Sequence, residues 1–226
     1  MNKNPLYELA KISRDHLRGI QYSNDNGYSL AQSFAKDLDS IIGTDLSEIV
    51  KPARAVRGLQ YAPIVFGVNV PSKIAAIHNT AKATFGYVHW TEFYEEDSWS
   101  KSFLPAFANG EGIGPDGRLL NSEIILGLFL LGPHTTYPEH AHPAEEFYLV
   151  LTGSPEFKVG IDADFELKKP GEVVLHHSEI SHSIRSSDEP FYAIYGWRGD
   201  IDARSWYRRN MADTCETKKH PTIEKS

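Results

Sequence analysis

The sequence predicts a mainly β protein, an antiparallel jelly-roll barrel preceded by a helical segment. Two observations carry this prediction. From about residue 122 to residue 197, short strand-like runs follow one another with turn residues between them and no helical pattern. The first sixty residues instead space their apolar side chains as a helix does. At 226 residues, the chain suits one domain of ordinary size with such an extension.

The N-terminal segment, residues 1–60, is expected to be mostly helical. Apolar residues recur at near-helical spacing in residues 5–20, and a turn is expected at 24–27. A second stripe at every fourth position runs from Ser29 to Ile42 and ends at Gly43. Thr44 or Asp45 is a candidate cap for a further short helix that reaches the Pro52 region. Such stripes are typical of packing, so we expect this segment to cover the barrel or a partner subunit.

The barrel is expected over residues 61–212. Its first strands are predicted at 64–70 and 84–90, and the run at 122–131 is nearly all apolar. Residues 97–118 are rich in Gly, Pro, Ser and Asn, which favours a long loop that acts as a lid. Further strands are expected at 146–151, 156–161, 165–168, 172–176, 182–185 and 191–197. The polar tail, residues 213–226, is expected to be poorly ordered from about Cys215.

Composition excludes several classes of function. A net charge of −7 argues against a nucleic-acid partner, because the chain offers no basic stripe to displace counterions from phosphates. The single cysteine, Cys215, excludes an internal disulfide and is compatible with a reducing compartment. The N-terminus lacks the apolar core of a secretory signal, and no apolar run is long enough to span a bilayer. We therefore expect a cytoplasmic protein without a membrane partner.

The chemistry is concentrated in residues 132–153, GPHTTYPEHAHPAEEFYLVLTG. Residues two apart in a strand point to the same face, which places His140 and His142 on one side and pairs Glu146 with Tyr148. Imidazole nitrogen and carboxylate oxygen are ligands for divalent transition metals, namely Zn, Fe, Mn, Co or Ni. If both pairs face one pocket, a metal site with open positions for a substrate results.

The spacing Gly132-x7-His140-x-His142-x3-Glu146-x6-Gly153 resembles the first motif of the cupin barrels. Pro170-Gly171-x10-His182 resembles the second motif, which supplies the last histidine ligand. The resemblance implies a cupin barrel that binds one divalent metal ion through His140, His142, Glu146 and His182. His176 and His177 compete with His182, which we favour because it begins a predicted strand. The gap between Gly132 and His140 is wider than in the general cupin pattern, and the second motif lacks a clear Pro-x-Gly-x-x-His.

Two tyrosines are candidate catalytic groups. Tyr148 shares a strand face with Glu146, and Tyr137 lies three residues before His140. A cation beside a phenol lowers its pKa and makes it a usable base near neutral pH. Core packing is the alternative interpretation of an aromatic residue in a strand.

The string from Tyr137 to Tyr148 resembles the cupin-type dimethylsulfoniopropionate (DMSP) lyases of marine bacteria. Chain length and the helical extension look most like the DddL branch. The resemblance implies cleavage of DMSP, a small-molecule substrate, into dimethyl sulfide and acrylate, with Tyr148 or Tyr137 as the base or as a substrate contact. Aromatic faces hold a sulfonium cation well, and the candidates for this role are Trp90, Tyr94, Tyr195 and Trp197, with Trp99, Phe129 and Tyr192 also considered. A homodimer built with the helical segment is a further expectation.

Two other functions fit parts of the same pattern. An iron dioxygenase or a sugar isomerase would use the same His/His/Glu/His site, but it would not need Tyr148. A metal-dependent small-molecule-binding cupin without turnover would need neither tyrosine. A purely structural barrel is disfavoured, because four metal-ligand side chains at motif spacing would otherwise be polar groups in a core without a purpose.

Overall fold

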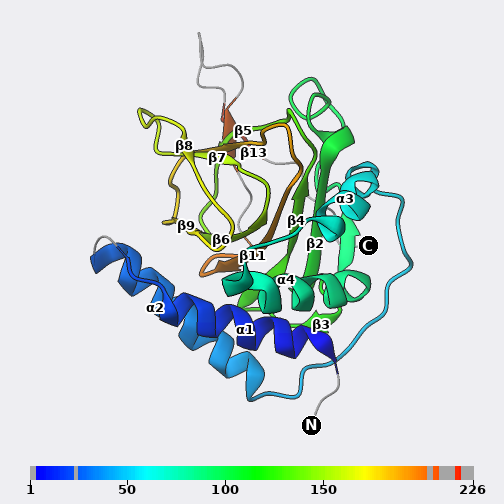
Figure 1. Ribbon diagram of the computed structural model, residues 1–226, viewed down its shortest axis with the longest axis vertical. Coiled ribbons are helices and arrows are strands. Elements are labelled where there is room, and N and C mark those ends of the chain that lie inside the picture. Colours follow the sequence, from blue (N-terminus) through cyan, green and yellow to red (C-terminus); the bar gives the residue numbers. More distant parts are fainter. Residues whose placement is uncertain (1–3, 23–24, 203–205, 209–216, 220–226) are drawn as a thin grey trace.

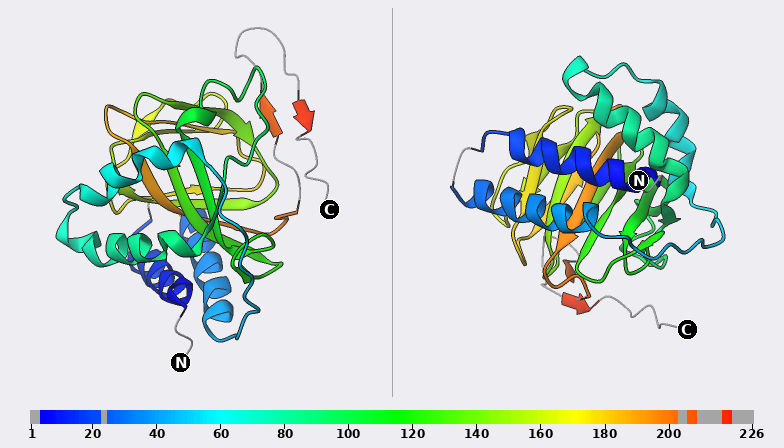
Figure 2. Two further views of the ribbon diagram at one scale, coloured as in Figure 1. Left: turned by 90° about the vertical axis from the view of Figure 1, so that its right-hand side faces the viewer. Right: turned by 90° about the horizontal axis from the view of Figure 1, so that it is seen from below.

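The computed structural model describes residues 4–22, 25–202, 206–208 and 217–219. Two antiparallel sheets face each other and form a barrel, and a layer of helices covers the outer face of one sheet (Figures 1 and 2). This arrangement confirms the mainly β jelly-roll barrel with an N-terminal helical extension.

The sheet under the helices has the strand order β1-β2-β4-β11-β6-β9, with β3 beside β2. Every pair is antiparallel except β2 with β3. Its strands are β1 (His89–Thr91), β2 (Phe107–Gly114), β3 (Leu119–Leu120), β4 (Ile124–Leu131), β6 (Glu145–Thr152), β9 (Val173–His176) and β11 (Phe191–Arg198).

The opposite sheet has the strand order β13-β12-β5-β10-β7-β8, and all of its pairs are antiparallel. Its strands are β5 (Thr136–Ala141), β7 (Glu156–Val159), β8 (Glu166–Leu167), β10 (His182–Arg185), β12 (Trp206–Arg208) and β13 (Thr217–Lys219). Apart from β5, which was not among the predicted strands, the strands from β4 to β11 match those predicted from the sequence.

The apolar run of β4 is explained by burial on both faces, since all eight of its residues are buried. Phe129 and Leu131 belong to the core inside the barrel. Leu128 and Leu130 belong to the core between the sheet and the helices. A strand covered on both sides loses the polar alternation of a half-exposed strand, which accounts for the continuous run in the sequence.

Helices α1 (Pro5–Gly19) and α2 (Asp25–Ile42) pack their apolar stripes against this sheet, together with α4 (Ser72–Thr84) (Figure 2). The side chain of Asn4 caps α1 by accepting a hydrogen bond from the amide of Leu6 at 3.1 Å. The expectation that the helical segment covers the barrel is thereby confirmed.

Several local predictions are wrong. Helix α2 already begins at Asp25, where a turn was expected, and residues 45–56 form no helix. The strand expected at 64–70 is instead helix α3 (Ala62–Gly67), and α4 follows it, flanked by the 3-10 turns η1 (Arg57–Tyr61) and η2 (Phe85–Tyr87). The β-branched residues of this stretch favour a strand locally, but the buried residues of α3, Ala62 and Val65, are three positions apart, which is helical spacing.

The predicted lid at 97–118 is also wrong. This segment contains the 3-10 turn η3 (Leu104–Ala106) and then β2, which pairs with β4 and forms a wall of the barrel. The glycines of β2 led to the prediction of a loop, but in the structure they allow close packing. A Cβ atom at Gly112 would lie 2.5 Å from Leu6 of α1, and one at Gly110 would lie 2.7 Å from Val88. Glycine here lets neighbouring elements approach the strand closely.

The expected disordered tail lies mostly outside the described residues, Cys215 included. Within it, Thr217–Lys219 form β13 and pair with β12. In the part of the chain that the structure describes, no helix has the length and apolar content needed to cross a lipid bilayer.

Candidate metal centre

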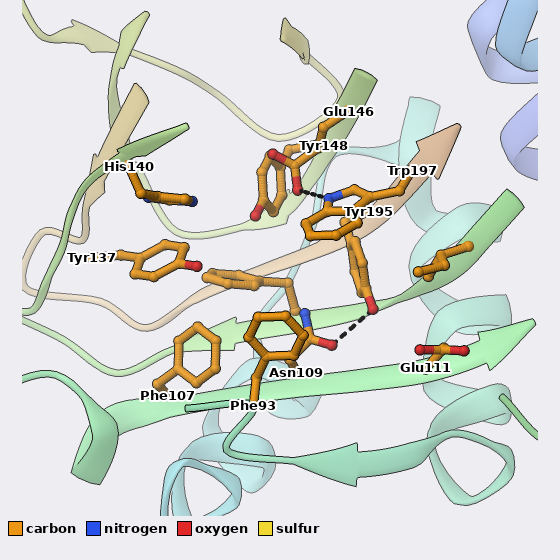
Figure 3. Close-up of a pocket in the computed structure, with 12 residues that line it drawn as sticks. Phe93, Phe107, Asn109, Glu111, Tyr137, His140, Glu146, Tyr148, Tyr195 and Trp197 are labelled. Carbon is orange, nitrogen blue, oxygen red and sulfur yellow. Dashed lines mark hydrogen bonds between the residues drawn. The ribbon is translucent and has the colours of Figure 1, made fainter. Parts of the chain in front are cut away.

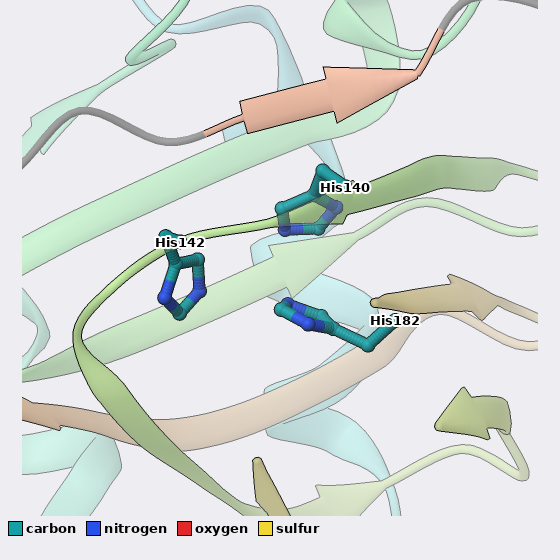
Figure 4. Close-up of side chains that lie close together, drawn as sticks. All are labelled: His140, His142 and His182. Carbon is teal, nitrogen blue, oxygen red and sulfur yellow. The ribbon is translucent and has the colours of Figure 1, made fainter. Parts of the chain in front are cut away.

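Three histidines face one another inside the barrel: His140 on β5, His142 just after it, and His182 at the start of β10 (Figure 4). His140 and His182 are direct cross-strand partners. The Nδ1 atom of each ring lies 2.8–2.9 Å from a backbone carbonyl oxygen two residues away. Because a carbonyl only accepts, each Nδ1 carries the proton, and each Nε2 keeps a lone pair for a metal. The acceptors are the carbonyls of Pro138, Ala144 and Ile180.

The Nε2 atoms of His142 and His182 are buried and have no hydrogen-bond partner among the described residues. Buried polar atoms are normally satisfied, so two such atoms side by side indicate a missing partner. One ring nitrogen from each of His140, His142 and His182 can be chosen so that all three lie within 4.8 Å of one another. The donor set therefore fits a divalent metal ion.

Glu146 on β6 completes this group. Its Oε2 atom lies 3.4 Å from Nε2 of His142 and 3.3 Å from Nε2 of His182. Burial alone would raise the pKa of Glu146, but its interactions with His142, His176 and His182 outweigh burial and hold the pKa of this carboxyl well below its usual value. Burial, followed by repulsion from the neighbouring imidazoles, holds the pKa of His140 well below its usual value. An ionised carboxylate and a neutral imidazole are the forms that bind metals.

His176 on β9 was considered only as a competitor of His182, but the structure places both in the site. The Nδ1–H of His176 donates to Oε2 of Glu146 at 2.8 Å, and its ring stacks on that of His182 at 3.9 Å between centroids. Glu146, His176 and His182 form a second possible metal-binding group. By contrast, His177 and His134 are exposed.

Replacement of His176 by alanine is expected to lower the affinity for a divalent metal about 10- to 100-fold, as loss of a partner that orients a ligand does. His176→Asn, whose amide N–H occupies a position similar to Nδ1–H, should restore part of it. The measurement is the dissociation constant of Co²⁺ or Zn²⁺, with exposed His177→Ala as the control. Unchanged affinity in His176→Ala would contradict the orienting role.

A pocket of about 400 Å³ opens from this group into the barrel (Figure 3). Both predicted catalytic tyrosines line it. Tyr148 lies beside Glu146 in the same strand, and the Tyr137 ring lies 4.3 Å from that of His140. The complete lining is Phe93, Phe107, Asn109, Glu111, Ile125, Phe129, Tyr137, His140, Glu146, Tyr148, Tyr195 and Trp197.

Both phenols are fully enclosed. Burial, and then the charge of Glu146, holds the pKa of Tyr148 well above its usual value. Burial, and then Tyr94, does the same for the pKa of Tyr137, whose hydroxyl hydrogen-bonds with that of Tyr94. In this environment each phenol keeps its proton unless a cation is placed beside it.

The predicted sulfonium contacts divide into two groups. Tyr195 and Trp197 on β11 line the pocket, and the indole N–H of Trp197 donates to Oε1 of Glu146 at 2.6 Å. Tyr94 lies behind Tyr137 and is not among the lining residues. Trp90 lies on the other face of the sheet, where it packs against the helix-side core and donates to the carbonyl of Phe85. Trp90 is therefore wrongly predicted as a pocket residue.

Sequence reasoning also missed Asn109 and Glu111. Both lie on β2, which was interpreted as a loop, and alternate positions on that strand face the pocket. The alternation Phe107, Asn109, Glu111 is the signal that could have identified them.

Comparison with known proteins shows the family to which the chain is similar. The family model of the dimethylsulfoniopropionate lyases matches residues 59–193. The chain is 32% identical to the DMSP lyase DddQ of Ruegeria pomeroyi over 128 residues, which are 57% of this chain and 63% of that protein. It is 31% identical over 116 residues to a protein of Cereibacter sphaeroides assigned as the DMSP lyase DddL, with 50% of this chain and 47% of that protein covered. The matches thus span less than two thirds of either relative.

Two solved structures share the fold over most of the chain. The crystal structure of DddQ from Ruegeria pomeroyi superposes with a TM-score of 0.64, 21% identity, and coverage of 90% of this chain and 96% of that one. A chain from the crystal structures of the DMSP lyases RdDddP and RnDddQII gives a TM-score of 0.67, 19% identity, and coverage of 91% and 98%.

Proposed function

We propose that this chain, which belongs to the dimethylsulfoniopropionate lyase family, cleaves DMSP into dimethyl sulfide and acrylate. The observation that carries the proposal is the convergence of histidine nitrogens and one carboxylate beside the phenol of Tyr148, at one end of an aromatic pocket. This arrangement provides a metal site and a base next to each other, which an elimination from a carboxylic acid requires.

His140, His142, Glu146 and His182 are the proposed metal ligands, with His176 holding Glu146 in place. When bound, a divalent transition metal ion (Zn, Fe, Mn, Co or Ni) supplies positive charge that stabilises both the enolate-like charge developing on the substrate and the phenolate form of Tyr148. The choice among these ions depends on their availability, since all of them accept imidazole and carboxylate ligands.

Tyr148 is the proposed base. Its phenolate takes the proton from the α-carbon of DMSP, and the electrons of that C–H bond form the double bond between the α- and β-carbons. The bond from the β-carbon to sulfur breaks, and its electron pair leaves with dimethyl sulfide. The products are acrylate, dimethyl sulfide and one proton held on Tyr148. Tyr137, whose ring lies 4.3 Å from that of His140, is the proposed substrate contact or the alternative base.

Tyr195 and Trp197 are the proposed aromatic contacts of the sulfonium group. Both line the pocket on the strand next to that of Tyr148. A cation over an aromatic face gains about 0.5–2 kcal/mol when it is removed from water.

The test is headspace detection of dimethyl sulfide after DMSP is added to protein stripped with a chelator and then reloaded separately with each of the five metals. We expect release with at least one metal and none from the stripped protein. Absence of release with every metal would overturn the lyase assignment. The expected homodimer is tested in the same preparation by light scattering during size-exclusion chromatography.

A further inference from the structure

The pocket has a second carboxyl, Glu111 on β2, at the end away from His140 (Figure 3). It takes no part in the chemistry proposed above. Glu111 is half-buried and faces a cavity whose other walls are mostly aromatic. A carboxylate in such a place is energetically unfavourable unless another interaction compensates it, because a charged group loses hydration when apolar surface surrounds it.

The register of the sheet connects Glu111 with the proposed base. Glu111 pairs with Gly127 on β4, Gly127 with Tyr195 on β11, and Tyr195 with Tyr148 on β6. These four positions form one row on the inner face of the sheet. Strands lie about 4.8 Å apart, so Glu111 is three strand spacings from Tyr148, with Tyr195 between them.

Gly127 is the one position in this row that has no side chain. A Cβ atom there would lie 2.6 Å from Cε1 of Tyr195 and 2.0 Å from the carbonyl oxygen of Gly110. The Tyr195 ring therefore lies close over β4, and its hydroxyl donates to Oδ1 of Asn109 at 2.8 Å. The row thus runs from the phenol of Tyr148, past the face of Tyr195, to the carboxyl of Glu111.

No Lys or Arg forms an ion pair with Glu111 among the described residues. Its Oε1 accepts a hydrogen bond from the amide of Asp116 at 2.6 Å. Burial raises the pKa of Glu111 to about 7; the charge of Asp116 adds to this, while turn amides and the charge of Lys51 oppose it. A cation bound in the pocket would favour the ionised form of Glu111.

We infer that Glu111 is the cation-recognising end of the pocket and makes the site prefer zwitterions, which carry both a carboxylate and an onium group, over carboxylates that have no onium group. This inference rests on the proposed function and names what that site selects. The carboxylate of the ligand lies toward the histidines, and the sulfonium or ammonium group lies along Tyr195 toward Glu111. Carboxylates of the same shape that have no onium group lack the charge that Glu111 attracts.

A structural role for Glu111 makes a different prediction. The carboxyl also orders the turn after β2, where a Cβ atom at Gly114 would lie 2.3 Å from its Oε1. If turn ordering were its whole role, removing its charge would lower the melting temperature or weaken all ligands alike. Selective loss of cationic ligands is specific to recognition of charge.

The experiment compares two ligands of equal shape and different charge, 3-(trimethylammonio)propanoate and 4,4-dimethylpentanoate, by calorimetric titration into metal-loaded protein. Wild type should bind the ammonium compound more tightly. In Glu111→Gln, the affinity for the ammonium compound should fall about tenfold, as loss of a charge pair in a partly screened site predicts. The affinity for the pentanoate, which has the carboxylate but no cationic group, should stay the same. Glu123→Gln, an exposed glutamate before β4, is the matched control.

An equal effect on both ligands, or an unchanged preference in a folded Glu111→Gln protein, would overturn the inference. Binding is measured without turnover, so failure of the lyase assay and failure of this test are separate results. With DMSP as substrate, Glu111→Gln should raise KM far more than it lowers kcat, because Glu111 binds the leaving group's charge and does not contact the α-proton.

Discussion

Tyr148→Phe is expected to lower kcat for dimethyl sulfide release by about 10²- to 10⁴-fold, the usual contribution of a general base. The phenyl ring keeps the contacts of Tyr148 with Phe129 and Phe157, so the fold and metal content should not change. Because only the proton acceptor is removed, the KM for DMSP should change little. The measurement is steady-state kinetics by headspace gas chromatography, with metal content determined on the same samples.

Tyr192→Phe is the matched control for this variant. Tyr192 is buried in the neighbouring strand, but it faces the helices, where its hydroxyl lies 3.3 Å from the carbonyl oxygen of Ala81. It should retain wild-type activity. Release that survives in Tyr148→Phe and disappears in Tyr137→Phe would move the base role to Tyr137. Full activity in both variants would contradict a tyrosine base altogether.

His142→Ala is expected to abolish stable metal binding and, with it, the release of dimethyl sulfide. The Nε2 atom of His142 is buried and has no hydrogen-bond partner among the described residues, and the His142 ring lies 4.3 Å from that of Trp197. Mutation of a residue that only hydrogen-bonds to a metal ligand lowers metal affinity by up to about 100-fold. Removal of a residue that binds the metal itself should lower it by more. The measurements are metal content after dialysis and the increase in melting temperature that added metal causes.

His134→Ala is the control, because His134 is exposed and lies outside the pocket. It should keep both its metal and its activity. If His142→Ala retained one equivalent of metal after dialysis, His142 would not be an essential ligand, and the second group that the structure brings together, Glu146, His176 and His182, would become a candidate ligand set.

The barrel could be predicted from the sequence because its strands from β4 onward are short, apolar and separated by turns. Helices α1 and α2 were equally clear from their stripes. The predictions that failed concern the residues between α2 and β4. Strand β2 carries Gly110 and Gly112 because helix α1 and Val88 approach its backbone closely, and nothing local distinguishes such a strand from a loop. Residues of α3 favour a strand in isolation, and only the fold makes them helical.

For the site, motif spacing located the residues that fall close together in the sequence. The structure brings His140, His142 and His182 into one buried group and Glu146, His176 and His182 into a second that shares His182, but which of them bind the metal stays a prediction. His176 could not be chosen over His177 from the sequence. The two residues are adjacent, and which of them faces the inside of the barrel depends on the position at which the strand begins its alternation. Trp90 was misplaced for the same reason, since the face on which an aromatic residue lies depends on pairing that the sequence does not reveal.

The three facing imidazoles take their orientation from the main chain, each through a carbonyl two residues away. A backbone acceptor is present whatever side chain its residue carries, so substitutions among neighbouring side chains leave the imidazole geometry unchanged. The part of the pocket wall on β2 and β4, which includes Asn109 and Glu111, is separate from these contacts. Over evolutionary time, this wall can therefore diverge toward new substrates while the descendants inherit the same arrangement of imidazoles.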